Sequence, residues 1–338
     1  MPLTDLGSPG FPLHPLHGPH QPTTGTPPRR PNSLRRTTSI DMTREDNSLD
    51  PVYLMGNGRD LFTARDGSVR ELGRAGLTAT IDMVPRVVQR IETRPAIDGM
   101  SRLAGAPAMS GFRAAVDKIA PQLRQRRELL YTLLDDVPVA TLISGHALSA
   151  SGILGDMVKS GYLPVADQCA GFVTGGLLTS SFEAGDPVIV TGPVAPDLDD
   201  LADPKAWHDM APLPIHGMRR RRRLDVAAND DAPTVSIDAM FRDTYMRSDS
   251  QETIIHEYTL TAAVDPDSGL ILQSEAVPRV LPWQECPGAV ASARRITGMT
   301  LSDLHFRVRQ ELTGTSTCTH LNDLLRFVAD ARALIEHL

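Results

Sequence analysis

The chain has 338 residues, of which 41% are hydrophobic, and its formal net charge is −7. This length exceeds the usual size of one hydrophobic core, so we expect two domains or one large duplicated domain. The negative charge argues against a dedicated nucleic-acid binder, because such proteins need a basic surface to neutralise phosphates. The sequence has no run of about 18 apolar residues, so no helix is expected to span a membrane.

Cysteine usage and the N-terminal sequence predict a cytoplasmic protein. The three cysteines are odd in number and widely spaced, so they do not suggest a disulfide framework. No basic segment followed by an apolar segment is present, so no signal peptide is expected. In a reducing cytoplasm, cysteines near histidines indicate metal binding or catalysis more often than disulfide bonds.

Composition divides the chain into four segments. Residues 1–34 are rich in Pro, Gly, Thr and His, which predicts a disordered tail. Residues 35–154 form an N-terminal half, and residues 216–338 form a C-terminal domain. Residues 155–215 between them are rich in Gly, Pro and Asp, which predicts a linker or lid with little regular structure.

The predicted elements follow a similar order in the two halves. For the first half we expect strands at 36–42 and 60–64, a β-hairpin over 77–93, and helices at 111–119 and 122–134. For the second half we expect strands at 219–226 and 235–245, a hairpin formed by 254–264 and 270–277, and helices near 289–296 and from 319 onwards.

Short repeated sequences support an internal duplication. They pair residues 35–42 (RRTTSIDM) with 221–226 (RRRLDV), 58–62 (GRDLF) with 241–245 (FRDTY), and 77–82 (LTATID) with 260–265 (LTAAVD). The first half has no counterpart of Cys286 or Cys318. A repeat there would therefore be a structural one with no site of its own.

The C-terminal domain contains four potential metal ligands: His256, Cys286, Cys318 and His320. Alternation along the strand 254–264 places His256 on its apolar, inward face. A proline directly after Cys286 and a threonine directly after Cys318 place each thiol at the N-terminus of a helix, where the helix dipole favours a thiolate. The sequence therefore predicts that the four side chains bind one ion, with zinc as the expected metal and iron as the alternative.

Other interpretations of these residues stay open. The histidines and cysteines could simply be buried in the core. Cys318 could instead be a nucleophile, activated by the helix N-terminus and by His320. If three protein ligands hold the metal, its open position would activate water in a hydrolase-like enzyme acting on a small molecule, with Glu257 or Glu285 as the base. Both glutamates could equally be outward-facing carboxylates.

Two features outside these four ligands also bear on binding. The five consecutive arginines Arg219–Arg223 alternate between the faces of a strand and could form a pocket for an anionic small molecule, because arginine binds phosphate and carboxylate through a bidentate fork. Alternatively they belong to a solvated edge strand that charge protects against aggregation. The linker carries Cys169, Trp207 and His208, and the sequence leaves open whether they join the site.

The order of these features resembles a bacterial family known only as a domain of unknown function. A basic strand at 219–226 is followed by His256-Glu257, by Pro-x-x-x-Cys at 282–286, by Thr-Gly-Met at 297–299, and by Gly-x-x-x-Cys-Thr-His-Leu-x-Asp-Leu-Leu at 314–325. The resemblance covers about residues 216–338. The family more often has aspartate at the position of Glu257 and glycine at the position of Thr317, and neither difference removes a predicted ligand. The resemblance implies a pattern of features and no particular reaction.

The sequence thus predicts an α+β fold, in which helices cover one face of antiparallel sheets and the halves form an internally duplicated pseudo-dimer. The leading functional prediction is a metal-binding protein whose ion joins a strand to helices through four protein ligands. A metal-dependent enzyme and a cysteine-nucleophile enzyme are the alternatives. The substrate and the oligomeric state cannot be derived from the sequence.

Overall fold

The computed structural model describes residues 13–45, 48, 50–153, 165–199, 202–229 and 231–338. Its main feature is one eight-stranded antiparallel sheet with the strand order β10-β9-β8-β7-β2-β3-β4-β5. The strands are β2 (Ser33–Thr43), β3 (Val52–Thr63), β4 (Val69–Asp82), β5 (Val87–Arg94), β7 (Met218–Ala228), β8 (Val235–Met246), β9 (Glu252–Val264) and β10 (Ile271–Val280). Two short strands, β1 (Leu13–Pro15) and β6 (Ile189–Thr191), form a separate parallel pair.

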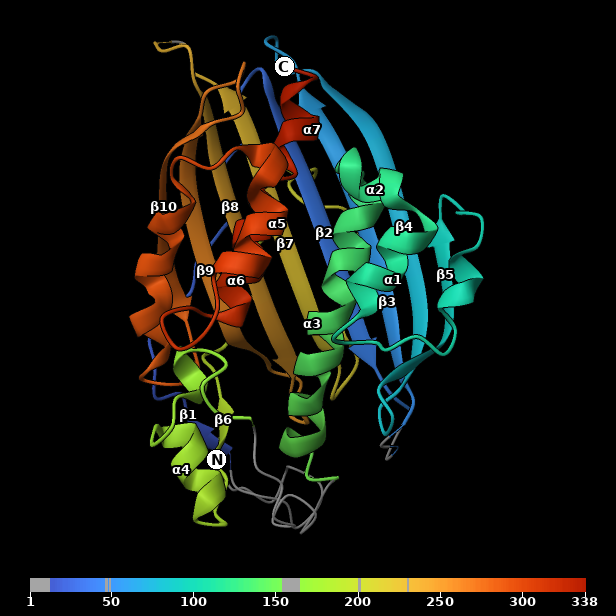
Figure 1. Cartoon of the computed structure of the whole chain (residues 1–338), viewed down its shortest axis with the longest axis vertical. Helices are drawn as coiled ribbons and strands as arrows, with labels where there is room; N and C mark the ends of the chain where they lie inside the picture. The colour runs from blue at the N-terminus through green and yellow to red at the C-terminus, as the bar shows by residue number, and fades with distance from the viewer. Residues whose placement is uncertain (1–12, 46–47, 49, 154–164, 200–201, 230) are drawn as a thin grey trace.

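Helices cover one face of this sheet, which we call the helix side (Figure 1). The helical elements are η2 (Met100–Leu103), α1 (Phe112–Ile119), α2 (Pro121–Gln125), α3 (Leu129–Ala150), η4 (Ala170–Phe172), α4 (Leu177–Glu183), η5 (Cys286–Ile296), α5 (Leu301–Glu311), α6 (Thr319–Val328) and α7 (Ala331–Ile335). Helix α3 packs on β2, β3 and β4, whereas α6 packs on β8 and β9 and η5 packs on β10. The α+β prediction is confirmed. None of the described helices combines the length and the apolar character that crossing a membrane requires.

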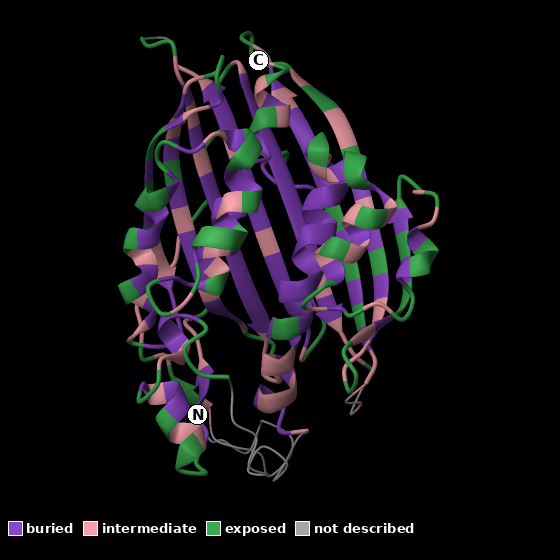
Figure 2. Ribbon diagram, viewed as in Figure 1, coloured by how far each residue is buried: buried purple, intermediate pink, exposed green. Residues whose placement is uncertain are grey.

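Two apolar clusters form the core, one under the helices of each half. In the strands, alternate residues enter these clusters, as Leu77, Ala79 and Ile81 do in β4. Most of α3 up to about residue 144 is buried on nearly all sides, which explains why its apolar residues occur on every face rather than along one stripe (Figure 2). Burying one Leu or Ile side chain contributes roughly 1.5–3 kcal/mol, so these clusters dominate the stability of both halves.

The opposite face, which we call the back, is covered by the N-terminal segment and by the segment between the halves. Arg29 forms an ion pair with Asp203 at 2.7 Å, and the Thr26 hydroxyl donates to the carbonyl of Leu198. The backbone N–H of Thr23 donates to Glu257 on β9. The predicted disordered tail is therefore wrong for residues 13–34, because their polar groups bind the back of the sheet. Residues 1–12 of that prediction lie outside the described residues.

The segment between the halves contains more structure than the sequence predicts. It includes η4, α4 and β6, and residues 202–216 cross the back of the sheet. There His208 hydrogen-bonds the hydroxyls of Thr37 and Ser39, and Arg59 donates to the carbonyls of Lys205 and Trp207. These contacts make the segment part of the fold. Residues 154–164 of the predicted linker lie outside the described part.

The two halves share one sheet, because β2 and β7 pair along their whole length. Each half contributes four consecutive antiparallel strands, so the strand order reads the same outward from the β2–β7 pair in both directions. The predicted strands are all present. Helix α3 runs to residue 150, well past the predicted end, and α5 is not predicted at all.

Candidate metal centre

Asp243, His256 and His320 form a compact cluster on the helix side of the sheet. Each offers one ligand atom, and these atoms lie within 4.8 Å of one another. His256 Nδ1 is 3.4 Å from Asp243 Oδ2, and the two imidazole rings are stacked with their centroids 3.8 Å apart. Across the described ranges this is the one group of three or more His, Cys, Asp or Glu side chains that satisfies such a distance limit.

The local backbone explains why these three side chains meet. Asp243 on β8 lies directly opposite His256 on β9, so both project from the same face of the sheet. The register shifts between Asp243 and Thr244, and this irregularity changes the alternation predicted for β9: Ile254 pairs with Thr244, while Ile255 enters the helix-side core. His320 reaches the pair from above, because it is the second residue of α6.

The polar atoms of this cluster have few partners. Both carboxylate oxygens of Asp243, Nδ1 of His256 and Nε2 of His320 are buried and have no hydrogen-bond partner in the described structure. Asp243 is fully buried, and burial together with the nearby His256 lowers the pKa of His320 well below its ordinary value. Leaving a buried polar atom unpaired costs roughly 1–3 kcal/mol. Four such atoms lie in the three adjacent side chains Asp243, His256 and His320.

Arg220 is the nearest cation to this cluster. It is fully buried, and its guanidinium lies 3.5–3.6 Å from carboxylate oxygens of Asp243, Asp136 and Asp323. None of its three side-chain nitrogens has a hydrogen-bond partner within the described ranges, and the group instead stacks on the Phe241 ring with Cζ 4.6 Å from the centroid. Arg220 therefore compensates the charge of Asp243 without occupying its oxygens.

A second histidine-bearing element borders the cluster from the N-terminal half. His146 of α3 lies edge-on against the Tyr245 ring, with centroids 5.3 Å apart, and its Nε2 is buried with no partner among the described residues. Tyr245 follows Asp243 two residues along β8 and so lies on the same face. Burial lowers the pKa of His146 to about 3, so its imidazole is neutral.

The three cysteines form a separate buried group beside this cluster. Cys318 directly precedes α6, and Cys286 is the first residue of η5. Cys318 lies beside Tyr258, which is two residues after His256 on β9. Cys169, from the segment between the halves, joins them and contacts Thr319. All three are free thiols. The structure thus brings His256 and His320 together but leaves Cys286 and Cys318 outside the compact group of ligand atoms.

Burial opposes the thiolate character that the sequence predicts for Cys286 and Cys318. Burial raises the pKa of Cys318 to about 11, which outweighs the opposing effect of the backbone N–H groups at the start of α6. Burial and the nearby Cys318 also raise the pKa of Cys286. Burial thus favours the protonated form of both thiols and opposes the effect of the helix N-terminus.

The two glutamates considered as bases lie away from the cluster. Glu257 projects to the back of the sheet, where it binds Arg242 at 2.5 Å and the N–H of Thr23 at 2.7 Å. Glu285 accepts the N–H of Leu177 at the start of α4. Trp207 and His208 also lie at the back, so of the three linker residues only Cys169 approaches the predicted site.

The arginine run lies in the middle of the sheet, because β7 pairs with β2 on one side and with β8 on the other. The interpretation as a solvated edge strand is therefore wrong. Arg220 and Arg222 project to the helix side, where Arg222 binds Asp136. Arg219 and Arg223 project to the back, where they bind Asp41 and Asp225, respectively. The charges are buried because carboxylates compensate them.

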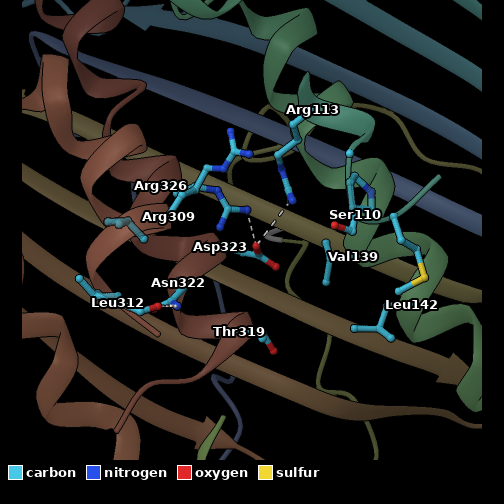
Figure 3. A pocket seen from close by; sticks show the side chains of 14 residues that line it. Ser110, Arg113, Val139, Leu142, Arg309, Leu312, Thr319, Asn322, Asp323 and Arg326 are labelled. Atoms are coloured by element: carbon cyan, nitrogen blue, oxygen red, sulfur yellow. Dashed lines mark hydrogen bonds and ion pairs between the residues drawn. The ribbon is translucent and has the colours of Figure 1, made fainter. Parts of the chain in front are cut away.

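A pocket of about 340 Å³ lies between α3 and the helices α5 and α6 (Figure 3). Arg113 of α1 and Arg326 of α6 both point toward Asp323, and both also bind Asp135 of α3. These ion pairs connect the helices of the two halves. Because each of these buried charges has a partner, we interpret the pocket wall as a structural contact.

Sequence reasoning missed Asp243 and His146, and it considered Arg220 only as part of the arginine run. An aspartate inside a strand usually faces solvent, so Asp243 can be recognised as a site residue only when it is known which face of the strand is buried. The repeated sequences were the available indication, since they align Asp60 with Asp243 and so mark an aspartate that occurs in both halves. In both halves the register shifts directly after this aspartate, and the residue opposite it is Gly73 in one half and His256 in the other.

The chain is thus an α+β protein in which a buried carboxylate and two histidines lie close enough together to be potential metal ligands. Residues 218–334 match the model of a family described as a protein of unknown function (DUF2889). The resemblance predicted for residues 216–338 is thus confirmed, and the match contains Asp243, His256 and His320. None of the curated proteins compared with the chain matches it.

Proposed function

We propose that the protein binds one divalent transition metal ion through Asp243, His256 and His320. The observation that carries the proposal is the set of four buried, unpartnered polar atoms in three adjacent side chains. Two imidazoles and one carboxylate are ligands of catalytic zinc and of non-haem iron(II), so zinc is the first metal to test and iron the second. The stacked rings would have to tilt so that their lone pairs converge.

The N-terminal half offers an internal comparison. Asp60 occupies on β3 the place that Asp243 has on β8, and both oxygens of Asp60 accept hydrogen bonds from Arg36, at 2.8 and 2.7 Å. Asp60 faces Gly73 instead of a histidine. The carboxylate at Asp243 has neither of these hydrogen bonds, so it is free to accept a metal. This comparison also supports the inference of an internal duplication in which only the second copy kept a ligand set.

Three protein ligands favour a second candidate function, a metal-dependent enzyme. A structural zinc site is usually closed by four protein ligands, whereas a catalytic one keeps a position for water or substrate. A metal here would supply Lewis acidity or an activated water. In such an enzyme Arg220 would place a positive charge beside the ligand carboxylate, and neither Glu257 nor Glu285 could act as the base because each binds groups elsewhere.

Cobalt titration of the metal-stripped protein tests the proposal. We expect Asp243→Asn and His320→Ala to weaken Co²⁺ binding at least 100-fold, while Cys286→Ala, Cys318→Ala and the exposed-carboxylate control Asp303→Asn leave it unchanged. Visible absorption reports binding, and the absence of sulfur-to-cobalt charge-transfer absorption separates this ligand set from the four-ligand set expected from the sequence. Loss of binding in Cys318→Ala with retention in Asp243→Asn would favour the latter. No binding by the wild-type protein would refute both.

A further inference from the structure

The back of the sheet carries a cavity of about 610 Å³, whose lining does not include Asp243, His256 or His320. Its floor is formed by Arg219 and Arg221 of β7, and its walls come mainly from residues 203–213. Trp207 and Leu213 supply buried apolar surface there, and Met246 contributes a thioether. A concave site with apolar walls and a few polar groups is typical of small-molecule binding.

Arg221 differs from the other arginines on this face of the sheet. Arg219 binds Asp41, Arg223 binds Asp225 and Asp238, and Arg242 binds Glu257, each through a charge-assisted hydrogen bond. In the part of the chain that the structure describes, Arg221 makes no hydrogen bond or ion pair, and its Nε is buried without a partner. Its guanidinium lies beside the Trp207 ring, with Cζ 5.9 Å from the centroid.

The buried Nε of Arg221 costs free energy for as long as no ligand accepts its hydrogen bond. Burial lowers the pKa of Arg221, which shows that the surroundings disfavour its charge. An arginine guanidinium presents a planar fork that matches a carboxylate, and burial against an aromatic ring strengthens that interaction. Arg219 cannot take this role, because its Nε and Nη2 already bind Asp41.

The charges around the cavity also limit how much negative charge a ligand can carry. Asp199 and Asp209 are exposed at its rim, and Glu252 lies near the floor, where it accepts a hydrogen bond from Thr244. These carboxylates would repel a polyanion such as a nucleoside triphosphate. A single carboxylate on an apolar, planar body can reach Arg221 while the body lies against Trp207. We propose that this cavity binds a small monocarboxylic acid, with Arg221 as the residue that recognises its carboxylate.

The test compares three probes of equal shape: benzoate, the neutral benzamide and the cationic benzylamine. In a Trp283→Phe background, Trp207 is the single tryptophan, so its fluorescence reports occupancy of the cavity. We expect benzoate to bind and benzamide to bind at least tenfold more weakly. Arg221→Gln should reduce benzoate affinity at least tenfold, Arg221→Lys should reduce it less, and Arg309→Gln, at an exposed arginine on the opposite face, should have no effect.

Thermal unfolding separates this role from a structural one. Because Arg221 is half-buried and its buried Nε has no partner among the described residues, Arg221→Gln should leave the melting temperature unchanged or raise it, whereas loss of a structural ion pair would lower it. Equal binding of benzoate and benzamide, tighter binding of benzylamine, or full benzoate affinity in Arg221→Gln would overturn the proposal. So would the failure of millimolar benzoate to change the Trp207 fluorescence of the wild-type background.

Discussion

Arg36 and Arg220 are two buried arginines on the helix side of the central strands. Replacing each of them by Met tests whether they differ in how strongly they bind the carboxylates around them. Arg36 donates to both oxygens of Asp60, at 2.8 and 2.7 Å, and to Asp330 at 3.0 Å. Arg220 approaches three carboxylates no closer than 3.5 Å and makes no hydrogen bond to any described residue. The two side chains have the same charge and similar burial but different bonding.

The expected losses of stability follow from this difference. Arg36→Met leaves Asp60 and Asp330 buried without their cation, and removing one partner of a buried ion pair costs roughly 3–5 kcal/mol. Arg220→Met leaves Asp243 without its nearby cation, whereas Asp136 keeps Arg222 and Asp323 keeps Arg326. It also removes three unpartnered buried nitrogens, each of which costs roughly 1–3 kcal/mol. These effects offset, so we expect a net change within about 1 kcal/mol for Arg220→Met.

Urea unfolding of the metal-stripped variants, followed by circular dichroism, measures both free energies of unfolding. Any bound metal must be removed, because a ligand that binds only the folded state stabilises it by an amount that grows with the logarithm of the ligand concentration. A loss in Arg220→Met as large as that in Arg36→Met would refute the reasoning. It would mean that Arg220 is a full structural partner of Asp243 and that the carboxylate is not free to accept a metal.

Three further predictions concern stability and reactivity. Burial lowers the pKa of His208 to about 3, whereas a histidine in the unfolded chain has a pKa of about 6.5, so the unfolded chain binds more protons as the pH falls below that value. Lowering the pH from 6.5 to 5 should therefore remove about 2 kcal/mol of stability through His208. Urea unfolding at the two pH values measures this loss, and the His208→Asn variant should not show the share that His208 contributes. Because the pKa of Cys318 is raised to about 11, iodoacetamide should alkylate it at pH 8 at least 100-fold more slowly in the folded protein than in urea, as mass spectrometry of the Cys318 peptide would show; equal rates would contradict its burial. A Cβ on Gly192 would lie 1.4 Å from the carbonyl oxygen of Ile254, so Gly192→Ala should cost more than about 2 kcal/mol in the free energy of unfolding, and a neutral result would show that this contact is misplaced.

The sequence predicted the strands well, and β9 in particular alternates between apolar and polar residues over much of its length. It underestimated α3, whose apolar sequence lacks a helical stripe because the helix is buried on nearly all sides. The N-terminal segment was misjudged for a different reason. Its composition is that of a disordered chain, but Arg29 and Thr26 bind groups on the segment between the halves, and no pattern in one sequence reports such a contact.

Part of the site was also predictable. Strand alternation placed His256 inward, and the start of α6 placed His320 near it, as the structure shows. Cys286 and Cys318 were grouped with them because cysteine near histidine suggests zinc, but the thiols lie in a neighbouring buried group with raised pKa values. The arginine run was misread because five charges predict an exposed strand unless the matching aspartates are known to lie opposite them.

The two halves place an aspartate at equivalent points of the sheet but surround it with different side chains. In each half an aspartate on the second strand is followed by a register shift, and it projects toward the helices. In the first half Arg36 saturates that aspartate and the opposite residue is Gly73, so the position serves the packing alone. In the second half His256 stands opposite, the helix above brings His320, and Arg220 lies too far to hydrogen-bond Asp243. Arginine placement and the residue opposite thus distinguish Asp60, both of whose oxygens accept hydrogen bonds from Arg36, from Asp243, whose oxygens have no hydrogen-bond partner among the described residues.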